Sequence, residues 1–229
     1  MKHQEGVGRP TPSFFFAPDL RDDTIMETEV TGILLAGGKS RRMGEDKQHL
    51  VIGEQTLLER GLAVFRSIFQ EVLVVIAQDS PSLGIDVRVV RDLVPDCGSL
   101  GGLYTGIAQA STSCIFVAAC DMPFLNQAVI AQFTSRRGAA DIVIARIADR
   151  LHPMHALYSK QCLPVLEQMI QARQLKIQEM VSHTSLRVQY VTEADLLTID
   201  PSGHSFYNVN TPGDLAAARS LLGRVPLSE

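Results

Sequence analysis

The chain has 229 residues, enough for one large domain or two small ones, and its 45% of hydrophobic residues can fill a core without a disulfide or metal staple. A formal net charge of −4 and a pI near 5.9 argue against general binding to nucleic acids, because proteins that bind phosphate backbones are usually basic. No apolar run approaches the roughly 20 residues of a membrane-spanning helix, so neither nucleic acid nor membrane is expected as a partner.

The N-terminal residues 1–28 mix proline, glycine and charged residues without hydrophobic periodicity. We interpret them as an extension, a candidate for disorder, outside a domain that is predicted to span residues 29–223. A frayed tail is predicted at 224–229. The run SFFFAP at residues 13–18 is too short for the apolar region of a signal peptide, and acidic residues follow it. The sequence therefore predicts a cytoplasmic protein.

Strands and helices alternate from residue 30 onward. Short apolar or β-branched runs predict strands at residues 30–36, 71–77, 87–90, 114–120, 140–147, 155–159 and 186–191. Helical spacing or capping residues predict helices at 56–69, 100–110, 163–172 and 177–183, and two more that begin at Asn126 and Thr211. This alternation predicts one three-layer α/β domain with a mainly parallel sheet, in which ligands bind at the carboxyl ends of the strands.

The cysteines are spaced too widely for a zinc site or a redox motif. They are Cys97, Cys114, Cys120 and Cys162. We therefore interpret them as buried, reduced thiols, which fits a reducing cytosol.

A glycine-rich loop, LAGGKSRRMGEDK, follows the first predicted strand at residues 35–47. Its small residues Ala36, Gly37 and Gly38 let backbone N–H groups approach phosphate oxygens or the edge of a base. Four cations match the charge of a triphosphate and of a leaving pyrophosphate: Lys39, Arg41, Arg42 and Lys47. The alternative is an ordinary strand-to-helix turn with a solvated basic rim, and the loop lacks both the GxxxxGK[ST] and the GxGxxG patterns.

Two acids follow later strands. Asp92 comes after the strand predicted at 87–90, where it could accept hydrogen bonds from guanine or ribose, or could cap the next loop. Asp121 follows the buried strand predicted at 114–120, where an ionised carboxylate is costly unless it is paired or bound to an ion. One carboxylate can anchor Mg²⁺ together with waters and substrate phosphates, although an acid at a helix N-terminus would explain the same residue.

Two polar pairs lie in the C-terminal half. His152 and His155 have HxxH spacing, but the segment reads as a strand and no third ligand is placed to complete a metal site. Asn208 and Asn210 have period-two spacing, which puts both side chains on one face of an extended segment, where they could point into the cleft. For Asn210, a cap before the helix that starts at Thr211 is an equal alternative.

The loop at 35–47 resembles the signature of the small α/β nucleotidyltransferases. Its Gly-Gly step is similar to the molybdenum cofactor guanylyltransferase branch, whereas related cytidylyltransferases more often read LAAG. Later segments keep the family's order: RDLVPDCGSLGGL at 91–103, CDMPF at 120–124, HPMHALYS at 152–159 and NVNTPGDL at 208–215. Two departures are Ser99, where proline is usual, and Gly213, where glutamate is usual. The resemblance covers nearly the whole predicted domain and implies a Rossmann-like nucleotidyltransferase fold.

The resemblance implies transfer of GMP from GTP to the phosphate of molybdopterin, with release of pyrophosphate and with Mg²⁺ as cofactor. It implies catalysis by Arg42, Lys47 and Asp121; nucleotide binding by Leu35, Ala36, Gly37, Gly38, Lys47, Asp92, Gly101 and Asp121; metal binding by Asp121; and acceptor binding by His152, Asn208 and Asn210. Molybdoenzymes or other proteins of the cofactor pathway are the further partners it implies. A nucleotidyltransferase that uses CTP or a sugar or isoprenoid phosphate remains an alternative, as does a nucleotide-binding regulator without catalysis.

Overall fold

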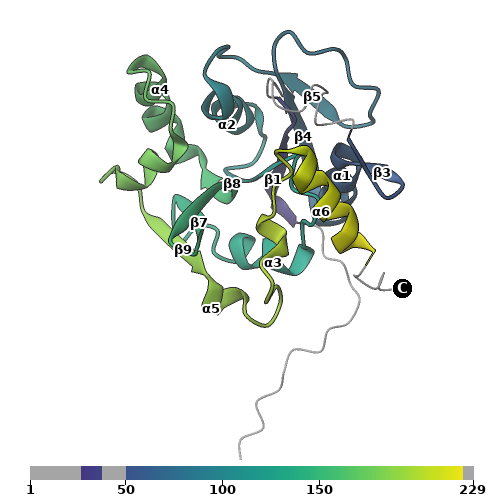
Figure 1. The fold of residues 1–229 in the computed structure, drawn as a ribbon. Helices are drawn as coiled ribbons and strands as arrows, with labels where there is room; N and C mark the ends of the chain where they lie inside the picture. Colours follow the sequence, from purple (N-terminus) through teal and green to yellow (C-terminus); the bar gives the residue numbers. More distant parts are fainter. Residues whose placement is uncertain (1–26, 38–49, 224–229) are drawn as a thin grey trace, which may run out of the picture.

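The computed structural model describes residues 27–37 and 50–223 (Figure 1). Its centre is a seven-stranded sheet in the order β5-β4-β1-β6-β8-β7-β9. The strands are β1 (Glu27–Leu35), β4 (Phe69–Ile76), β5 (Arg88–Arg91), β6 (Cys114–Ala119), β7 (Ile142–Ile147), β8 (Arg150–Ser159) and β9 (Val188–Thr192). Within this sheet six strands run in the same direction and β8 runs in the opposite direction. The predicted α/β class with a mainly parallel sheet is confirmed.

Helices cover both faces of the sheet (Figure 1). Apolar side chains of α1 and α3 pack on one face, and those of α2 and α4 pack on the other. The helices are α1 (Leu57–Ile68), α2 (Gly98–Gln109), α3 (Gln127–Thr134), α4 (Leu163–Gln171), α5 (Glu193–Leu196) and α6 (Pro212–Leu222), with the 3-10 turns η2 (Lys160–Cys162), η3 (Ile177–Ser182) and η4 (His204–Phe206). No helix in the described ranges is both long enough and apolar enough to span a membrane.

Strand β6 shows how the sequence produces two cores. Phe116 and Ala118 belong to the cluster that contains α1 and α3, whereas Ile115 and Val117 belong to the cluster that contains α2 and α4. Because both faces of the strand are buried, its sequence is a continuous apolar run without polar alternation.

Capping residues set the starts of three helices, as predicted. At α1 the Glu59 N–H donates to Thr56 Oγ1 at 3.2 Å, and the Thr56 N–H donates to the Glu59 carboxylate at 2.7 Å. The Asn126 side chain accepts from two backbone N–H groups at the start of α3. Thr211 and Asp214 form the same reciprocal box at α6.

Strand β8 begins at Arg150, five residues before the predicted start of its strand. Its residues His152 and Ala156 pair with consecutive residues of β7, so the three residues between them form a bulge. The bulge accommodates Pro153, which has no N–H to offer the ladder. This proline is the physical reason why the sequence pattern understates the strand.

Other differences concern short elements. A hairpin of β2 (Val51–Ile52) and β3 (Gln55–Thr56), and the four-residue α5, are too short to show a period in the sequence. The segment expected as a helix at 177–183 is the 3-10 turn η3, and β1 begins three residues before the predicted start at 30.

All four cysteines are free thiols. Cys97, Cys120 and Cys162 are buried, and Cys114 is half-buried. Burial raises the pKa of the Cys162 thiol to about 12, so this thiol stays protonated at neutral pH.

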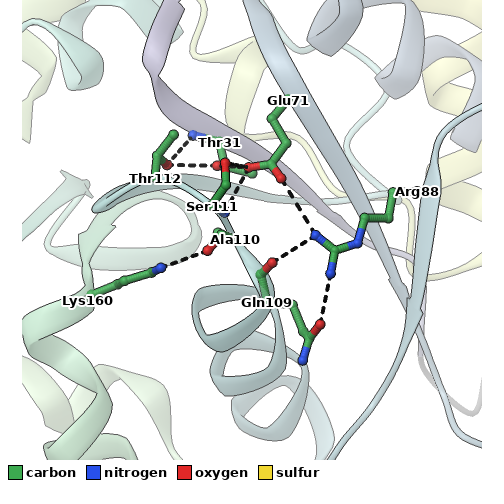
Figure 2. Close-up of polar contacts among 8 residues, drawn as sticks. All are labelled: Thr31, Glu71, Arg88, Gln109, Ala110, Ser111, Thr112 and Lys160. Atoms are coloured by element: carbon green, nitrogen blue, oxygen red, sulfur yellow. Dashed lines mark hydrogen bonds and ion pairs between the residues drawn. The ribbon is translucent and has the colours of Figure 1, made fainter.

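A polar network lies at the amino ends of the strands, around Glu71 (Figure 2). The Glu71 carboxylate accepts from Thr31 Oγ1 at 2.5 Å, from the Ser111 N–H at 3.0 Å and from Ser111 Oγ at 2.7 Å. These bonds tie β1 and β4 to the turn that precedes β6.

Two cations hold the C-terminal end of α2 in the same region (Figure 2). Arg88 Nη1 donates to the Gln109 carbonyl at 3.0 Å, and Lys160 Nζ donates to the Ala110 carbonyl at 2.7 Å. Positive charge at this end is favoured by the helix dipole. Because α2 is one continuous helix, these bonds also help to position its N-terminal end at the opposite edge of the sheet.

Candidate active site

The carboxyl ends of β1, β4, β5 and β6 meet at one edge of the sheet. Three backbone hydrogen bonds continue the ladders past the strand ends: Ala36 N–H to Val75 O at 2.8 Å, Asp92 N–H to Ile76 O at 2.9 Å, and Cys120 N–H to Leu35 O at 3.0 Å. The segments that carry Ala36, Asp92 and Asp121 therefore start from fixed positions on the edge where such sheets bind ligands.

A cavity of about 1400 Å³ opens along this edge. The predicted site residues that line it are Leu35, Ala36, Gly37, Asp92, Asp121, His152, Asn208 and Asn210. Gly101 is not among its lining residues. Gly38, Lys39, Arg41, Arg42 and Lys47 lie outside the described residues. The structure thus brings the nucleotide-side and acceptor-side candidates that it describes into one cavity.

Two glycines are needed because other backbone lies close to them. A Cβ on Gly37 would lie 2.9 Å from the Ala77 nitrogen, so only glycine lets this loop rest against the end of β4. A Cβ on Gly101 would lie 2.7 Å from the Val94 oxygen and 3.0 Å from Asp92 Oδ2. Gly101 therefore lets α2 pack closely against the loop that contains Asp92 and Val94.

Asp92 caps its own loop with one carboxylate oxygen. Its Oδ1 accepts from Thr105 Oγ1 at 2.9 Å and from the Val94 N–H at 3.0 Å. Thr105, which is fully buried, also accepts from the Leu93 N–H at 2.9 Å. The loop-capping interpretation of Asp92 is therefore correct for Oδ1, and it leaves the role of Oδ2 open.

Asp121 is joined to the segment that contains the two asparagines. The Val209 N–H donates to the Asp121 carbonyl at 2.9 Å, which places Asn208 and Asn210 on either side of the junction. The Asn210 N–H donates to Asp214 Oδ2 at 3.0 Å, so its backbone takes part in the cap of α6, although the N-cap residue itself is Thr211.

The two histidines of the HxxH segment contact the same phenyl ring. The ring centroids of His152 and His155 lie 5.0 and 4.7 Å from that of Phe206, whose carbonyl accepts from Asn208 Nδ2 at 3.1 Å. Burial and the charge of Arg150 lower the pKa of His152, and burial lowers the pKa of His155 to about 3. Both rings are therefore neutral at pH 7, and His155 lies in the core behind the cavity wall.

The donor set suits a hard cation held by one carboxylate. Asp121 lies half-buried at the end of the central strand β6 and lines the cavity. Mg²⁺ usually takes one or two protein carboxylates and completes its shell with waters and substrate phosphates. No group of three or more His, Cys, Asp or Glu residues that could hold a metal ion occurs among residues 27–37 and 50–223.

Six lining residues with a charged or amide side chain were not singled out from the sequence. They are Gln78, Asp79, Asp96, Arg150, Lys176 and Gln178. Gln78 and Asp79 directly follow β4, so the rule that ligands bind at carboxyl ends of strands could have identified them. Arg150 gives no such signal, because the sequence pattern does not extend β8 back to it.

Proteins similar in sequence to this chain are named for the same activity. Residues 32–188 match the family described as the MobA-like NTP transferase domain. The chain is 34% identical over 191 residues to the probable molybdenum cofactor guanylyltransferase of Pelotomaculum thermopropionicum, with 83% of this chain and 92% of that protein covered. It is 32% identical over 200 residues to the molybdenum cofactor guanylyltransferase of Desulfosudis oleivorans, with 86% and 98% covered.

Solved structures agree with the fold. The molybdopterin-guanine dinucleotide biosynthesis protein A of Archaeoglobus fulgidus superposes with a TM-score of 0.76 at 26% identity, covering 85% of this chain and 100% of that one. The 2-C-methyl-D-erythritol 4-phosphate cytidylyltransferase of Thermus thermophilus gives a TM-score of 0.62 at 17% identity, covering 84% and 98%. The fold alone therefore does not distinguish the nucleotide, and the sequence relatives carry that distinction.

Proposed function

The chain belongs to the MobA-like NTP transferase family, and within it to the molybdenum cofactor guanylyltransferases, and from that premise we propose that it transfers GMP from GTP to the phosphate of molybdopterin. Pyrophosphate is the second product, and the first is the guanine dinucleotide form of the cofactor. One observation carries the proposal: Asp92, Asp121 and the pair Asn208 and Asn210, which are far apart in the sequence, line one cavity at the carboxyl edge of the sheet.

In this reaction a phosphate oxygen of the acceptor attacks the α-phosphorus of GTP, and the bond from that phosphorus to the pyrophosphate oxygen breaks. The acceptor is already an anion, so the step needs no general base. The protein has to align two anionic substrates and to neutralise the charge that grows on the leaving pyrophosphate. We assign the neutralising role to Arg42 and Lys47, the cations that the family signature places in the loop after β1.

We assign magnesium binding to Asp121. Its carboxylate offers the oxygen ligand that Mg²⁺ prefers, and its backbone is held in place by the hydrogen bond from Val209. When bound there, the ion supplies positive charge next to the substrate phosphates. The residues of the chain itself bind the two substrates and orient them for the reaction.

Different lining residues are proposed to bind the nucleotide and the acceptor. Backbone groups of Ala36 and Gly37 and the Oδ2 oxygen of Asp92 are proposed to bind the nucleotide. On the acceptor side we propose His152, Asn208 and Asn210. A neutral His152 ring can both donate and accept, which suits a pterin that carries donors and acceptors on its edge.

The test is pyrophosphate release by the purified chain with each of ATP, CTP, GTP and UTP, with and without molybdopterin and Mg²⁺. We expect release with GTP, molybdopterin and Mg²⁺ together. A preference for CTP would make the chain a cytidylyltransferase. Tight GTP binding without any pyrophosphate would instead favour a regulator that binds nucleotide.

A further inference from the structure

Charge is unevenly distributed among the described residues that line the cavity. Their carboxylates belong to the segments that follow β4, β5 and β6, on the proposed nucleotide side: Asp79, Asp92, Asp96 and Asp121. The lining residues that are described include two permanent cations, Arg150 and Lys176, and Arg150 lies two residues from His152 in β8, on the proposed acceptor side. An anionic acceptor would be repelled by the carboxylates unless a cation receives it at its own end.

Arg150 reaches this edge because β8 is antiparallel to its neighbours. The carboxyl ends of β1, β4, β5 and β6 form the edge, and the amino end of an antiparallel strand meets the same edge. Arg150 is the first residue of β8, and it pairs with Ile147, the last residue of β7. The β7–β8 turn thus places a cation on the same edge of the sheet as the acids that follow the parallel strands.

That turn is held in a specific, strained conformation. Its two residues, Ala148 and Asp149, have φ angles of 47° and 57°, in the left-handed region that two-residue hairpin turns use and that glycine or asparagine usually occupies. The Ala148 N–H donates to the Glu193 carboxylate, which fastens the turn to α5. Because this bond anchors the turn, the backbone position of Arg150 is fixed as well.

The other arginine of the hairpin is already engaged. The Arg146 guanidinium lies over the Tyr190 ring, 4.7 Å from its centroid, and Arg146 does not line the cavity. The Arg150 side chain, in contrast, is exposed and makes no hydrogen bond or ion pair with any residue that the structure describes. The Lys176 side chain is 82% exposed, and its Nζ lies 3.9 Å from a Glu179 oxygen.

We infer that Arg150 binds the terminal phosphate of the acceptor and so makes a phosphorylated acceptor the preferred one. A guanidinium can donate two parallel hydrogen bonds to a phosphate, which fixes the orientation of the attacking oxygen as well as its charge. The inference rests on the proposed function for the identity of the acceptor. Burial, and to a lesser degree the charge of Arg150, lowers the pKa of His152, so the two neighbours act as one cation and one uncharged donor.

The experiment compares wild type with Arg150→Gln, Arg150→Lys and, as a control on the same hairpin, Arg146→Gln. Fluorescence titration without GTP gives the Kd for molybdopterin, and steady-state kinetics give KM for molybdopterin and for GTP. Loss of a charged hydrogen-bond partner should raise the Kd and KM for molybdopterin about 10- to 100-fold in Arg150→Gln. The KM for GTP should change less than about twofold, because that substrate binds at the other end. Arg150→Lys should lie between, and Arg146→Gln should resemble wild type.

Each outcome decides a separate question. If wild type is active and Arg150→Gln binds molybdopterin equally well, the inference is overturned and the proposed function stands. If wild type binds molybdopterin but never releases pyrophosphate, the proposed function fails, and the titration still decides the role of Arg150. If wild type does not bind molybdopterin, both are overturned. Thermal unfolding of each variant checks its fold, and Arg150→Lys decides the matter if Arg150→Gln is unfolded.

Discussion

The Val209 N–H donates a hydrogen bond of 2.9 Å to the Asp121 carbonyl oxygen. Asp121 follows β6 at the centre of the sheet, whereas Val209 lies between two asparagines just before α6. Val209 is fully buried and packs in a cluster with Leu57 and Leu215, so water does not compete for this bond. One buried backbone contact therefore fixes the proposed magnesium ligand relative to the proposed acceptor-binding segment.

Replacement of Asp121 by asparagine tests the proposed magnesium ligand. The side chain keeps its size but loses its charge, so pyrophosphate release should fall on the order of 10²-fold or more. The melting temperature should stay close to that of wild type. Asp86→Asn, which removes an exposed acid that does not line the cavity, is the matched control and should be fully active. Activity of Asp121→Asn within a few-fold of wild type would rule out the assignment.

Gly37→Ala tests the close approach of the glycine-rich loop to β4. The new methyl would lie 2.9 Å from the Ala77 nitrogen, which is backbone and cannot move aside cheaply. We expect overpacking to destabilise the domain by about 1–3 kcal/mol and the displaced loop to raise the KM for GTP. Gly84→Ala is the control, because a Cβ there meets nothing within 4 Å. Equal stability and equal KM for the two variants would contradict the packing argument.

Two variants can distinguish the two roles of Asp92, loop capping and nucleotide binding. Asparagine can keep the oxygen that accepts from Thr105 and Val94, but it presents an amide donor where the second carboxylate oxygen stood. Asp92→Asn should thus stay folded and raise the KM for GTP about tenfold or more. Thr105→Val should lower the free energy of unfolding by about 1–3 kcal/mol with a smaller effect on KM. An unchanged KM in Asp92→Asn would mean that Asp92 serves only its loop.

Much of the fold can be predicted from the sequence, because many strands and helix starts are determined by residues within a single segment. The run CIFVAAC predicts a strand buried on both faces, and Thr56 with Glu59 predicts the start of α1, since each depends on neighbours along the chain. The bulge at Pro153 and the two-residue strands of the β2–β3 hairpin are not visible, because they depend on pairing with distant segments.

The site residues also fall into those that the sequence predicts and those that depend on contacts between distant segments. Asp92, Asp121 and Asn208 line the cavity as expected, because each sits in a motif at the end of a strand or before a helix. Gly101 supports the Asp92 loop without lining the cavity, which only the packing distances reveal. Arg150 is missed because its position depends on the direction of β8, a property of the whole sheet.

Glu71→Gln tests the network at the amino ends of the strands (Figure 2). Burial by itself would raise the pKa of Glu71, but hydrogen bonds from Thr31 and Ser111 and the charge of Arg88 lower it below its usual value. A lowered pKa in the folded state stabilises the fold at pH values above the unfolded pKa of about 4.3. This contribution is lost as pH falls through the folded pKa.

Wild type should therefore exceed Glu71→Gln in free energy of unfolding by about 1–3 kcal/mol at pH 7, and the difference should shrink below about pH 4. Urea unfolding at several pH values measures it. A difference that stays constant down to pH 3 would show that the charge of Glu71 is not what stabilises the network.

His155→Phe tests a buried histidine among aromatic rings. The His155 ring is fully buried between Phe116, Phe133 and Phe206, and neither of its nitrogens has a hydrogen-bond partner within the described residues. Burial, and to a lesser degree His152, lowers the pKa of His155 to about 3, while the nearby Ser205 backbone opposes the shift only partly. An unfolded histidine has a pKa of about 6.5, so between these values the unfolded state binds a proton that the folded state does not.

The fold of wild type should accordingly lose up to about 1.4 kcal/mol per pH unit through His155 as pH falls from about 6.5 towards 3. Phenylalanine removes both this loss and the buried polar atoms, so His155→Phe should be more stable than wild type by about 1 kcal/mol or more at pH 7. Its advantage should then grow at pH 6, 5 and 4, as measured by urea unfolding. An advantage that does not change with pH would mean that His155 is protonated in the folded state or is not buried as described.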